Sequence, residues 1–215
     1  MKECDLVEIS GSILGIKNKT KEEIDKFYKS GINYLHIDVM DGKFVKNISL
    51  PYHEVESIVT SDQKLDIHLM VSDVYKYVLD FIKLKPEYIT FHIEAVSNPL
   101  ELINLIKKNN VKVGLAIKPS TNIEVIKPYL DLIDLVLVMT VEPGMGGQEL
   151  ILDTISKIED LSKIKDRHFK IEADGGINDK TIHKLNKLDI AVVGSFLTNG
   201  DYKERLKDVV KWKNF

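Results

Sequence analysis

The sequence predicts a (β/α)8 barrel, a closed ring of eight parallel strands with a helical segment after each strand. Eight short apolar runs alternate with stretches of helical periodicity along 215 residues, as in a chain of βα units. Most of these runs are apolar at consecutive positions, which is typical of strands buried on both faces. The main structural alternative, an open doubly wound sheet, lacks its glycine fingerprint after the first run. We therefore expect one barrel domain over residues 1–215.

Composition excludes several classes of protein. A hydrophobic content of 44% and a charged content of 29% are typical of a soluble domain with a sizeable core. A net charge of −3 gives no reason to expect nucleic acid or an anionic membrane as partner. Cys4 is the only cysteine, which fits a reducing compartment, and the N-terminal residues lack an apolar signal core. We expect a cytoplasmic protein.

The first half of the chain contains five strand signals. The capping-box pattern from Thr20 to Glu23 begins a helix that ends near Gly31, and Ser72-Asp73 caps another helix. Further helices are expected near residues 51–61 and around Leu102 to Ile106, where apolar residues recur at helical spacing. The strands that these helices separate are expected at residues 6–14, 34–39, 65–71, 88–93 and 112–117.

The second half continues the same alternation. A second capping box at Thr121 to Glu124 predicts a helix to about Leu132. Strands are expected at residues 135–141, 169–173 and 190–193. Helices are expected around residues 151–158, after Asn178-Asp179, and around residues 206–210.

Polar side chains gather where the predicted strands end. Strand parity places His36 and Asp38 on one face, and the other polar residues at strand ends are His68, His92, Glu94 and Asp174. All these ends face one mouth of a barrel, and buried charges must be paired or bound to metal. Two histidines and two carboxylates meeting there predict a divalent-metal site suited to zinc, iron or manganese. The alternatives are a polar cluster without metal and, for His36 alone, an ordinary core histidine.

Glycines follow the last three predicted strands. They form the groups Gly144 to Gly147, with Met145 between them, Gly175-Gly176, and Gly194-Ser195. Backbone amides freed by glycine can form an anion-binding nest, and loops after strands seven and eight commonly bind phosphate in barrel enzymes. Turn glycines are the usual reason for such pairs, but three groups on adjacent units predict a phosphorylated substrate.

Three methionines lie at or near the same strand ends: Met40, Met70 and Met139. Methionines in such positions normally fill the core. The alternative is that they line the pocket as a polarizable wall beside the metal.

Five motifs stand in a fixed order along the chain. They are His36-Ile37-Asp38-Val39-Met40-Asp41-Gly42, Asp66-Ile67-His68-Leu69-Met70-Val71, Gly114-Leu115-Ala116-Ile117-Lys118-Pro119, Val138-Met139-Thr140-Val141-Glu142-Pro143-Gly144-Met145-Gly146-Gly147-Gln148 and Asp174-Gly175-Gly176. Together they resemble the ribulose-phosphate 3-epimerase family, from Ser12 to about Ser195.

The resemblance implies a metal-dependent TIM barrel that interconverts D-ribulose 5-phosphate and D-xylulose 5-phosphate in the pentose phosphate pathway. It implies one divalent metal per subunit (Zn, Fe, Mn or Co) and a homo-oligomer. Asp38 would be the proton acceptor and Asp174 the proton donor, and both would bind the metal together with His36 and His68. The residues implied for substrate binding are Ser12, His68, Gly144, Met145, Gly146, Gly147, Gly175, Gly176, Gly194 and Ser195.

The implied chemistry needs two acids. Inverting a carbon beside a ketone requires that a proton leave one face and return to the other, and one carboxylate cannot reach both. The resulting enediolate carries oxygen charge, which a metal ion stabilises.

Other functions compete with this interpretation. Allulose-6-phosphate 3-epimerase performs the same chemistry on a longer sugar, but it tends to interrupt the glycine pairs. A lyase of the orotidine-monophosphate decarboxylase type would need an Asp-x-Lys-x-x-Asp motif that no strand end supplies, and a non-catalytic sugar-phosphate sensor would not need the acid pair. Departures from the family pattern leave substrate preference open; they lie at residues 15–18, Lys43, Lys46, Met145 and Ala173.

Overall fold

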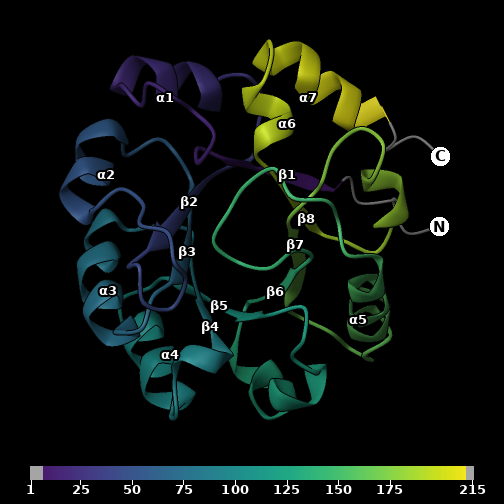
Figure 1. Cartoon of the computed structure of the whole chain (residues 1–215). Helices are drawn as coiled ribbons and strands as arrows, with labels where there is room; N and C mark the ends of the chain where they lie inside the picture. Colours follow the sequence, from purple (N-terminus) through teal and green to yellow (C-terminus); the bar gives the residue numbers. More distant parts are fainter. Residues whose placement is uncertain (1–6, 212–215) are drawn as a thin grey trace.

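A computed structural model describes residues 7–211, and these residues form a closed barrel of eight parallel strands in sequential order. Figure 1 shows the strands at the centre and the helices in a ring around them. The predicted fold class is confirmed. The strands are β1 (Glu8–Ser12), β2 (Tyr34–Met40), β3 (Leu65–Met70), β4 (Tyr88–His92), β5 (Lys112–Ile117), β6 (Leu135–Met139), β7 (Lys170–Asp174) and β8 (Ile190–Val193).

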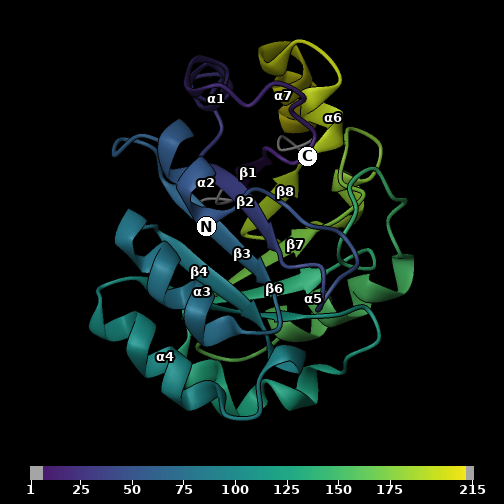
Figure 2. The same cartoon turned by 60° about the vertical axis from the view of Figure 1, so that its left-hand side comes forward.

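Helices cover the outside of the barrel (Figure 2). The α-helices are α1 (Lys21–Tyr28), α2 (Tyr52–Ile58), α3 (Val74–Phe81), α4 (Pro99–Lys108), α5 (Ile155–Ser162), α6 (Ser195–Thr198) and α7 (Tyr202–Val210). Short 3-10 helices are η1 (Ile82–Leu84), η2 (Ile93–Ala95), η3 (Ile123–Val125), η4 (Lys127–Leu132), η5 (Leu152–Thr154) and η6 (Ile182–Lys184).

The expected helix caps are present at two helices. The Thr20 side chain accepts a hydrogen bond from the Glu23 amide at the start of α1, and Asp73 accepts one from the Lys76 amide at the start of α3. Each cap satisfies one amide that the first turn leaves without a partner inside the helix.

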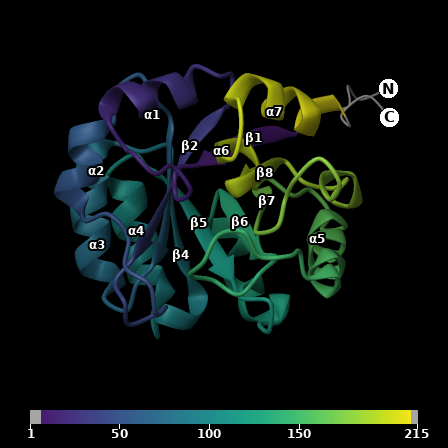
Figure 3. The same cartoon turned by 45° about the horizontal axis from the view of Figure 1, so that its top comes forward.

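The outer ring closes where the first and last helices meet. α1 and α7 lie side by side (Figure 3), and Tyr202 packs edge-on against Phe27 with ring centroids 4.8 Å apart. The Tyr202 hydroxyl also donates to Glu23 Oε1 at 2.6 Å.

The helix expected from Thr121 to Leu132 is wrong as an α-helix. The segment forms the two 3-10 helices η3 and η4 instead. Pro128 lies inside it, and an α-helix there would lose one amide donor and bring the proline ring against the carbonyl of Glu124. The expected helix after Asn178-Asp179 is likewise only the single 3-10 turn η6.

Strand register brings the polar strand ends together. The parallel pairing sets Asp38 beside His68 and Met40 beside Met70. The register also sets Ser12 of β1 beside His36 of β2 and Asp174 of β7 beside Met139 of β6. Because neighbouring strands share this register, side chains far apart in sequence reach one mouth of the barrel.

Within residues 7–211, no helix combines the length and the apolar character needed to cross a membrane. Cys4, the one cysteine of the sequence, lies outside the described residues.

Candidate functional site

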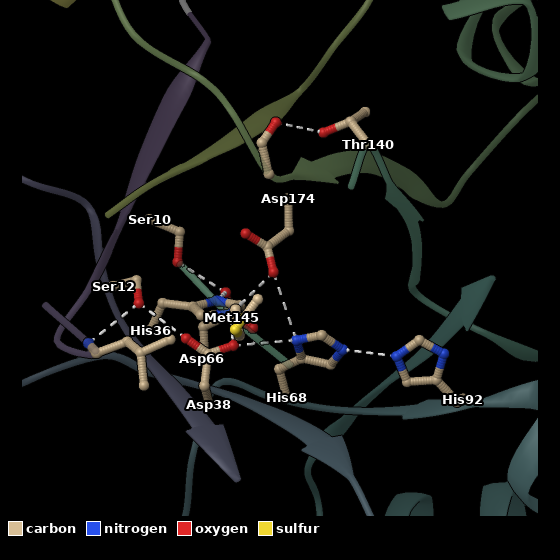
Figure 4. Close-up of polar contacts among 12 residues, drawn as sticks. Ser10, Ser12, His36, Asp38, Asp66, His68, His92, Thr140, Met145 and Asp174 are labelled. Carbon is tan, nitrogen blue, oxygen red and sulfur yellow. Dashed lines mark hydrogen bonds and ion pairs between the residues drawn. The ribbon is translucent and has the colours of Figure 1, made fainter. Parts of the chain in front are cut away.

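A cluster of two histidines and two aspartates lies at the C-terminal mouth of the barrel. His36 and Asp38 come from β2, His68 from β3 and Asp174 from β7. Asp38 Oδ1 lies 3.4 Å from His36 Nε2 and 3.3 Å from His68 Nδ1. Asp174 Oδ2 lies 4.0 Å and 3.6 Å from the same two nitrogens. Figure 4 shows the two carboxylates converging on the rings from different strands.

Two nitrogens at the centre of this cluster have no hydrogen-bond partner among residues 7–211. They are His36 Nε2 and His68 Nδ1, and both are buried. The other nitrogen of His36, Nδ1, lies 2.7 Å from Asp66 Oδ2. In the neutral ring Nδ1 therefore carries the proton, and Nε2 presents a lone pair to two carboxylates. That arrangement is suited to a cation.

The four residues fit a divalent metal. Each offers one donor atom, and these atoms lie within 4.8 Å of one another. Imidazole nitrogens and carboxylate oxygens without thiolates suit zinc, iron, manganese or cobalt at a catalytic rather than a structural site.

The histidines and aspartates of the cluster shift one another's pKa values. Burial lowers the pKa of His36, but Asp66 and Asp38 outweigh it and hold that pKa well above its usual value. Burial likewise lowers the pKa of His68, but the neighbouring Asp174 and Asp38 outweigh it and raise that pKa overall. Burial raises the pKa of Asp38, but the two histidines lower it overall. The site therefore favours an ionised Asp38 carboxylate.

The two oxygens of Asp38 have different partners. Oδ1 faces the histidines, while Oδ2 accepts a hydrogen bond of 2.8 Å from the Ser12 hydroxyl. Ser12 in turn accepts from the Leu14 amide at 3.2 Å. The Asp38 side chain is 6% exposed and that of Asp174 is 18% exposed, so Asp174 is the more open of the two acids.

A second polar layer lies beneath the cluster, and its acids, Asp66 and Glu172, were not among the expected site residues. Asp66 accepts hydrogen bonds from Ser10 at 2.7 Å and from His36. Glu172 is fully buried, and burial together with the Asp66 carboxylate raises its pKa well above the usual value. Strand parity could have identified both acids as interior, because Asp66 shares the face of His68 and Glu172 the face of Asp174.

His92 and Glu94 lie outside the four-residue cluster. His92 ends β4, and its Nε2 lies 3.0 Å from Nε2 of His68. Its Nδ1 lies 3.1 Å from Oε2 of Glu94 in η2. Burial lowers the pKa of His92 to about 4, so its ring is neutral at neutral pH.

The glycine groups lie on the loops that follow β6, β7 and β8. Gly175 and Gly176 adopt positive φ angles of 123° and 67°, which residues with side chains rarely adopt. A Cβ atom on Gly176 would lie 2.4 Å from the Leu150 amide nitrogen. The Thr140 hydroxyl donates to the Gly175 carbonyl at 2.6 Å and fixes this turn (Figure 4).

The loop between β6 and α5 crosses in front of the barrel centre in Figure 1. Asn47, on the loop after β2, donates to the Gly144 carbonyl at 2.7 Å and ties the two loops together. The Gln148 side chain donates to the carbonyls of Glu142 and Met145 at 2.7 and 2.8 Å. Neither Asn47 nor Gln148 was among the expected site residues.

Both acids and all three glycine groups line one cavity of about 340 Å³. The expected site residues that line it are Ser12, Asp38, Met40, Met70, Met139, Gly144, Met145, Gly146, Gly147, Asp174, Gly175, Gly176, Gly194 and Ser195. Residues that line it without having been expected are Leu14, Gly15, Val141, Gln148, Ile177 and Val192. His36 and His68 are fully buried beneath the cavity.

Known proteins match this chain through their sequences. The sequence model of the ribulose-phosphate 3-epimerase family matches residues 8–198. A ribulose-phosphate 3-epimerase of Candida glabrata is 41% identical over 80% of this chain and 76% of its own. One of Bacillus subtilis is 40% identical over 74% of this chain and 76% of its own.

Solved structures at low identity show the fold alone. A 3-hexulose-6-phosphate synthase from Salmonella typhimurium superposes with a TM-score of 0.67 at 16% identity, covering 96% of this chain and 98% of its own. A tryptophan synthase from Mycobacterium tuberculosis gives a TM-score of 0.69 at 10% identity, covering 99% and 94%. The family model and the curated relatives, by contrast, match through the sequence itself, and they show that this chain belongs to the ribulose-phosphate 3-epimerase family.

Proposed function

We propose that Asp38 and Asp174 are the two acids of the epimerisation that family membership assigns to this chain, the interconversion of D-ribulose 5-phosphate and D-xylulose 5-phosphate. The observation that supports this assignment most strongly is the pairing of these carboxylates across two buried histidines. They come from β2 and β7, which β1 and β8 separate along the barrel wall. Two acids that enter the cavity from different strands can serve different faces of one carbon.

Asp38 removes the proton from carbon 3 of the sugar in one direction. Ser12 holds Oδ2 of Asp38, so the carboxylate keeps a fixed orientation as it exchanges the proton. Asp174, the more open acid, returns a proton to the opposite face, and the roles reverse in the other direction. His36, Asp38, His68 and Asp174 would hold a divalent cation, and such a cation would supply a Lewis acid for the negative charge that develops on the sugar oxygens.

The glycine side of the mouth binds the phosphate in this proposal. Gly176, Gly194 and Ser195 line the cavity that also contains both acids. Positive φ at Gly175 and Gly176 turns the backbone so that amide groups are available to an anion. Phosphate fixed here holds the sugar carbon between the two acids, which lowers the entropic part of the barrier.

The methionines form one wall of this cavity in the same proposal. Met40, Met70 and Met139 are each no more than 4% exposed and line it beside Asp38 and Asp174. Their thioethers offer neither a strong donor nor an acidic proton, so they do not compete for the proton being transferred.

The decisive experiment measures metal content and activity together. The purified chain is assayed with ribulose 5-phosphate and with allulose 6-phosphate before chelation, after chelation and after return of Zn, Fe, Mn or Co. We expect loss of activity on chelation, recovery on metal addition and preference for the five-carbon sugar. Full activity of a metal-free chain would overturn the metal assignment, and preference for allulose 6-phosphate would overturn the substrate.

The assembly and compartment are further proposals. We expect a homo-oligomer, from the family resemblance, and a cytoplasmic location, from the single cysteine Cys4. Light scattering of the purified chain tests the first, and cell fractionation tests the second. The extent of the domain over all of residues 1–215 is a proposal of the same kind, which limited proteolysis tests.

A further inference from the structure

We propose that His92 and Glu94 are positioning residues that hold His68 in the tautomer whose Nδ1 binds the metal. The inference rests on the proposed function, because it takes His68 to be a metal ligand. It follows from a chain of hydrogen bonds that starts outside the barrel and ends at the centre of the site (Figure 4 shows the inner part).

The outer end of this chain is the Glu94 carboxylate. Its Oε1 accepts a hydrogen bond of 2.8 Å from the Lys118 amide and another from the Thr121 hydroxyl. These donors and the His92 ring overcome the effect of burial and lower the pKa of Glu94 to about 2. An ionised carboxylate only accepts hydrogen bonds. Its Oε2, 3.1 Å from His92 Nδ1, therefore requires the proton of His92 on that nitrogen.

The proton position on His92 decides the one on His68. His92 is fully buried, and a neutral ring with its proton on Nδ1 carries a lone pair on Nε2. This lone pair faces Nε2 of His68 at 3.0 Å, so that nitrogen must be the donor. The neutral His68 ring that can bind a metal then has no proton on Nδ1, which faces Asp38 Oδ1 at 3.3 Å and Asp174 Oδ2 at 3.6 Å.

The loop that holds Glu94 is itself anchored. Lys157 of α5 donates to the carbonyls of Lys118, Pro119 and Thr121 at 3.0, 2.7 and 2.5 Å. Three carbonyls on one ammonium group fix the segment whose amide and hydroxyl bind Glu94. The chain of contacts therefore runs from a helix on the barrel surface to the metal ligand without a gap.

The His92 ring is also shielded from the mouth. Phe44, on the loop after β2, lies against it with ring centroids 4.9 Å apart. The Lys118 ammonium lies 4.1 Å from the centre of the Phe44 ring. Shielding keeps water from replacing His92 as the partner of His68 Nε2.

Metal affinity tests the proposal without any assay of turnover. The metal-free full chain is titrated with Zn²⁺ against a chromophoric chelator. We expect His92→Leu to weaken binding about 10- to 100-fold, the usual effect of removing a partner of a ligating histidine. His92→Gln keeps an amide oxygen that can accept from His68 and is expected to recover most of the affinity.

Matched controls separate positioning from packing. Thr90→Val changes a buried residue two positions earlier on β4, whose hydroxyl has no partner among residues 7–211, and is expected to bind Zn²⁺ as the wild-type chain does. Glu94→Ala is expected to weaken binding about tenfold, whereas Glu101→Ala, an exposed acid on α4, is expected to leave it unchanged.

The proton positions can be observed directly. Nitrogen-15 spectra of the Zn²⁺-loaded chain are expected to show the protons on His92 Nδ1 and His68 Nε2. A proton on His92 Nε2 would overturn the proposal. So would a folded His92→Leu chain, checked by circular dichroism, that binds Zn²⁺ within twofold of wild type. If the wild-type chain bound no Zn²⁺, Mn²⁺ or Co²⁺, the proposed function itself would fail.

Discussion

The barrel mouth has two parts that differ in what faces the cavity. One part, the side-chain side, consists of the ionisable side chains at the ends of β2, β3 and β7, which have buried partners, as Asp38 has Ser12. The other part, the glycine side, consists of the loops after β6, β7 and β8, where glycines such as Gly176 present backbone and a side chain from elsewhere holds the turn, as Thr140 holds Gly175. Proton transfer needs groups that titrate, whereas holding a phosphate needs amide donors at fixed positions.

This difference means that the two sides should fail in different ways. A change on the side-chain side should lower turnover while the substrate still binds. A change on the glycine side should weaken substrate binding and alter turnover less. Kinetics that separate kcat from KM therefore test the comparison itself.

Asp38→Asn and Asp174→Asn should have the largest effects. Each replaces a carboxylate by an amide of the same shape that cannot accept the proton, so we expect kcat to fall about 10³- to 10⁴-fold with KM changed little. The measurement is a steady-state assay in both directions, with metal content determined for each variant. Near-normal epimerisation by either variant would sink the two-acid assignment.

Gly176→Ala should break the other side of the comparison. At a φ of 67° and with the Leu150 amide nitrogen 2.4 Å from the new Cβ, the turn must move. We expect KM to rise about tenfold or more, equivalent to about 1.4 kcal/mol of lost binding, with a smaller change in kcat.

Gly200→Ala is the control for this change. Gly200 lies between α6 and α7, where the three atoms nearest to a new Cβ all belong to the flexible side chain of Arg205. A KM like that of wild type is expected. If Gly176→Ala lowered kcat and left KM unchanged, the assignment of phosphate binding to the glycine side would be wrong.

The side-chain part of the site could be predicted because strand geometry is regular. A period of two fixes which residues of β2 face inward, and parallel register then sets Asp38 beside His68. The backbone side could be predicted only as a region, because a sequence shows where Gly176 stands but not its φ angle or its distance from Leu150.

Hydrogen-bond partners, one helix type and the exposure of one side chain could not be predicted from the sequence. The partners of Asp66 and Glu94 depend on distances across the barrel, which a one-dimensional pattern does not contain. The helix expected from Thr121 fails at Pro128, where the lost hydrogen bond outweighs the favourable capping pattern. Met145, expected at the substrate, is 61% exposed at the cavity rim.

Glu94, which holds His92 behind the side-chain side, should make the free energy of unfolding sensitive to acid. The pKa of Glu94 is lowered to about 2 from 4.5, so Glu94 contributes stability that is present above pH 4.5 and lost as pH falls towards 2. Glu94→Gln removes this contribution, about 1–3 kcal/mol. Urea unfolding at pH 7 and pH 3 should therefore show a smaller difference between the variant and wild type at the lower pH.

The methionine wall should give the smallest effect, because it contacts both sides without titrating. Met139→Leu keeps the volume and replaces a polarizable thioether beside Asp174 by a less polarizable chain. We expect kcat to fall a few-fold, with the free energy of unfolding changed by less than about 1.5 kcal/mol. Leu137→Met, two residues earlier on β6 and outside the residues that line the cavity, makes the reverse change as a control. If Met139→Leu left kcat unchanged, the sulfur would be core filler, and catalysis on this side would belong to the carboxylates and their histidines.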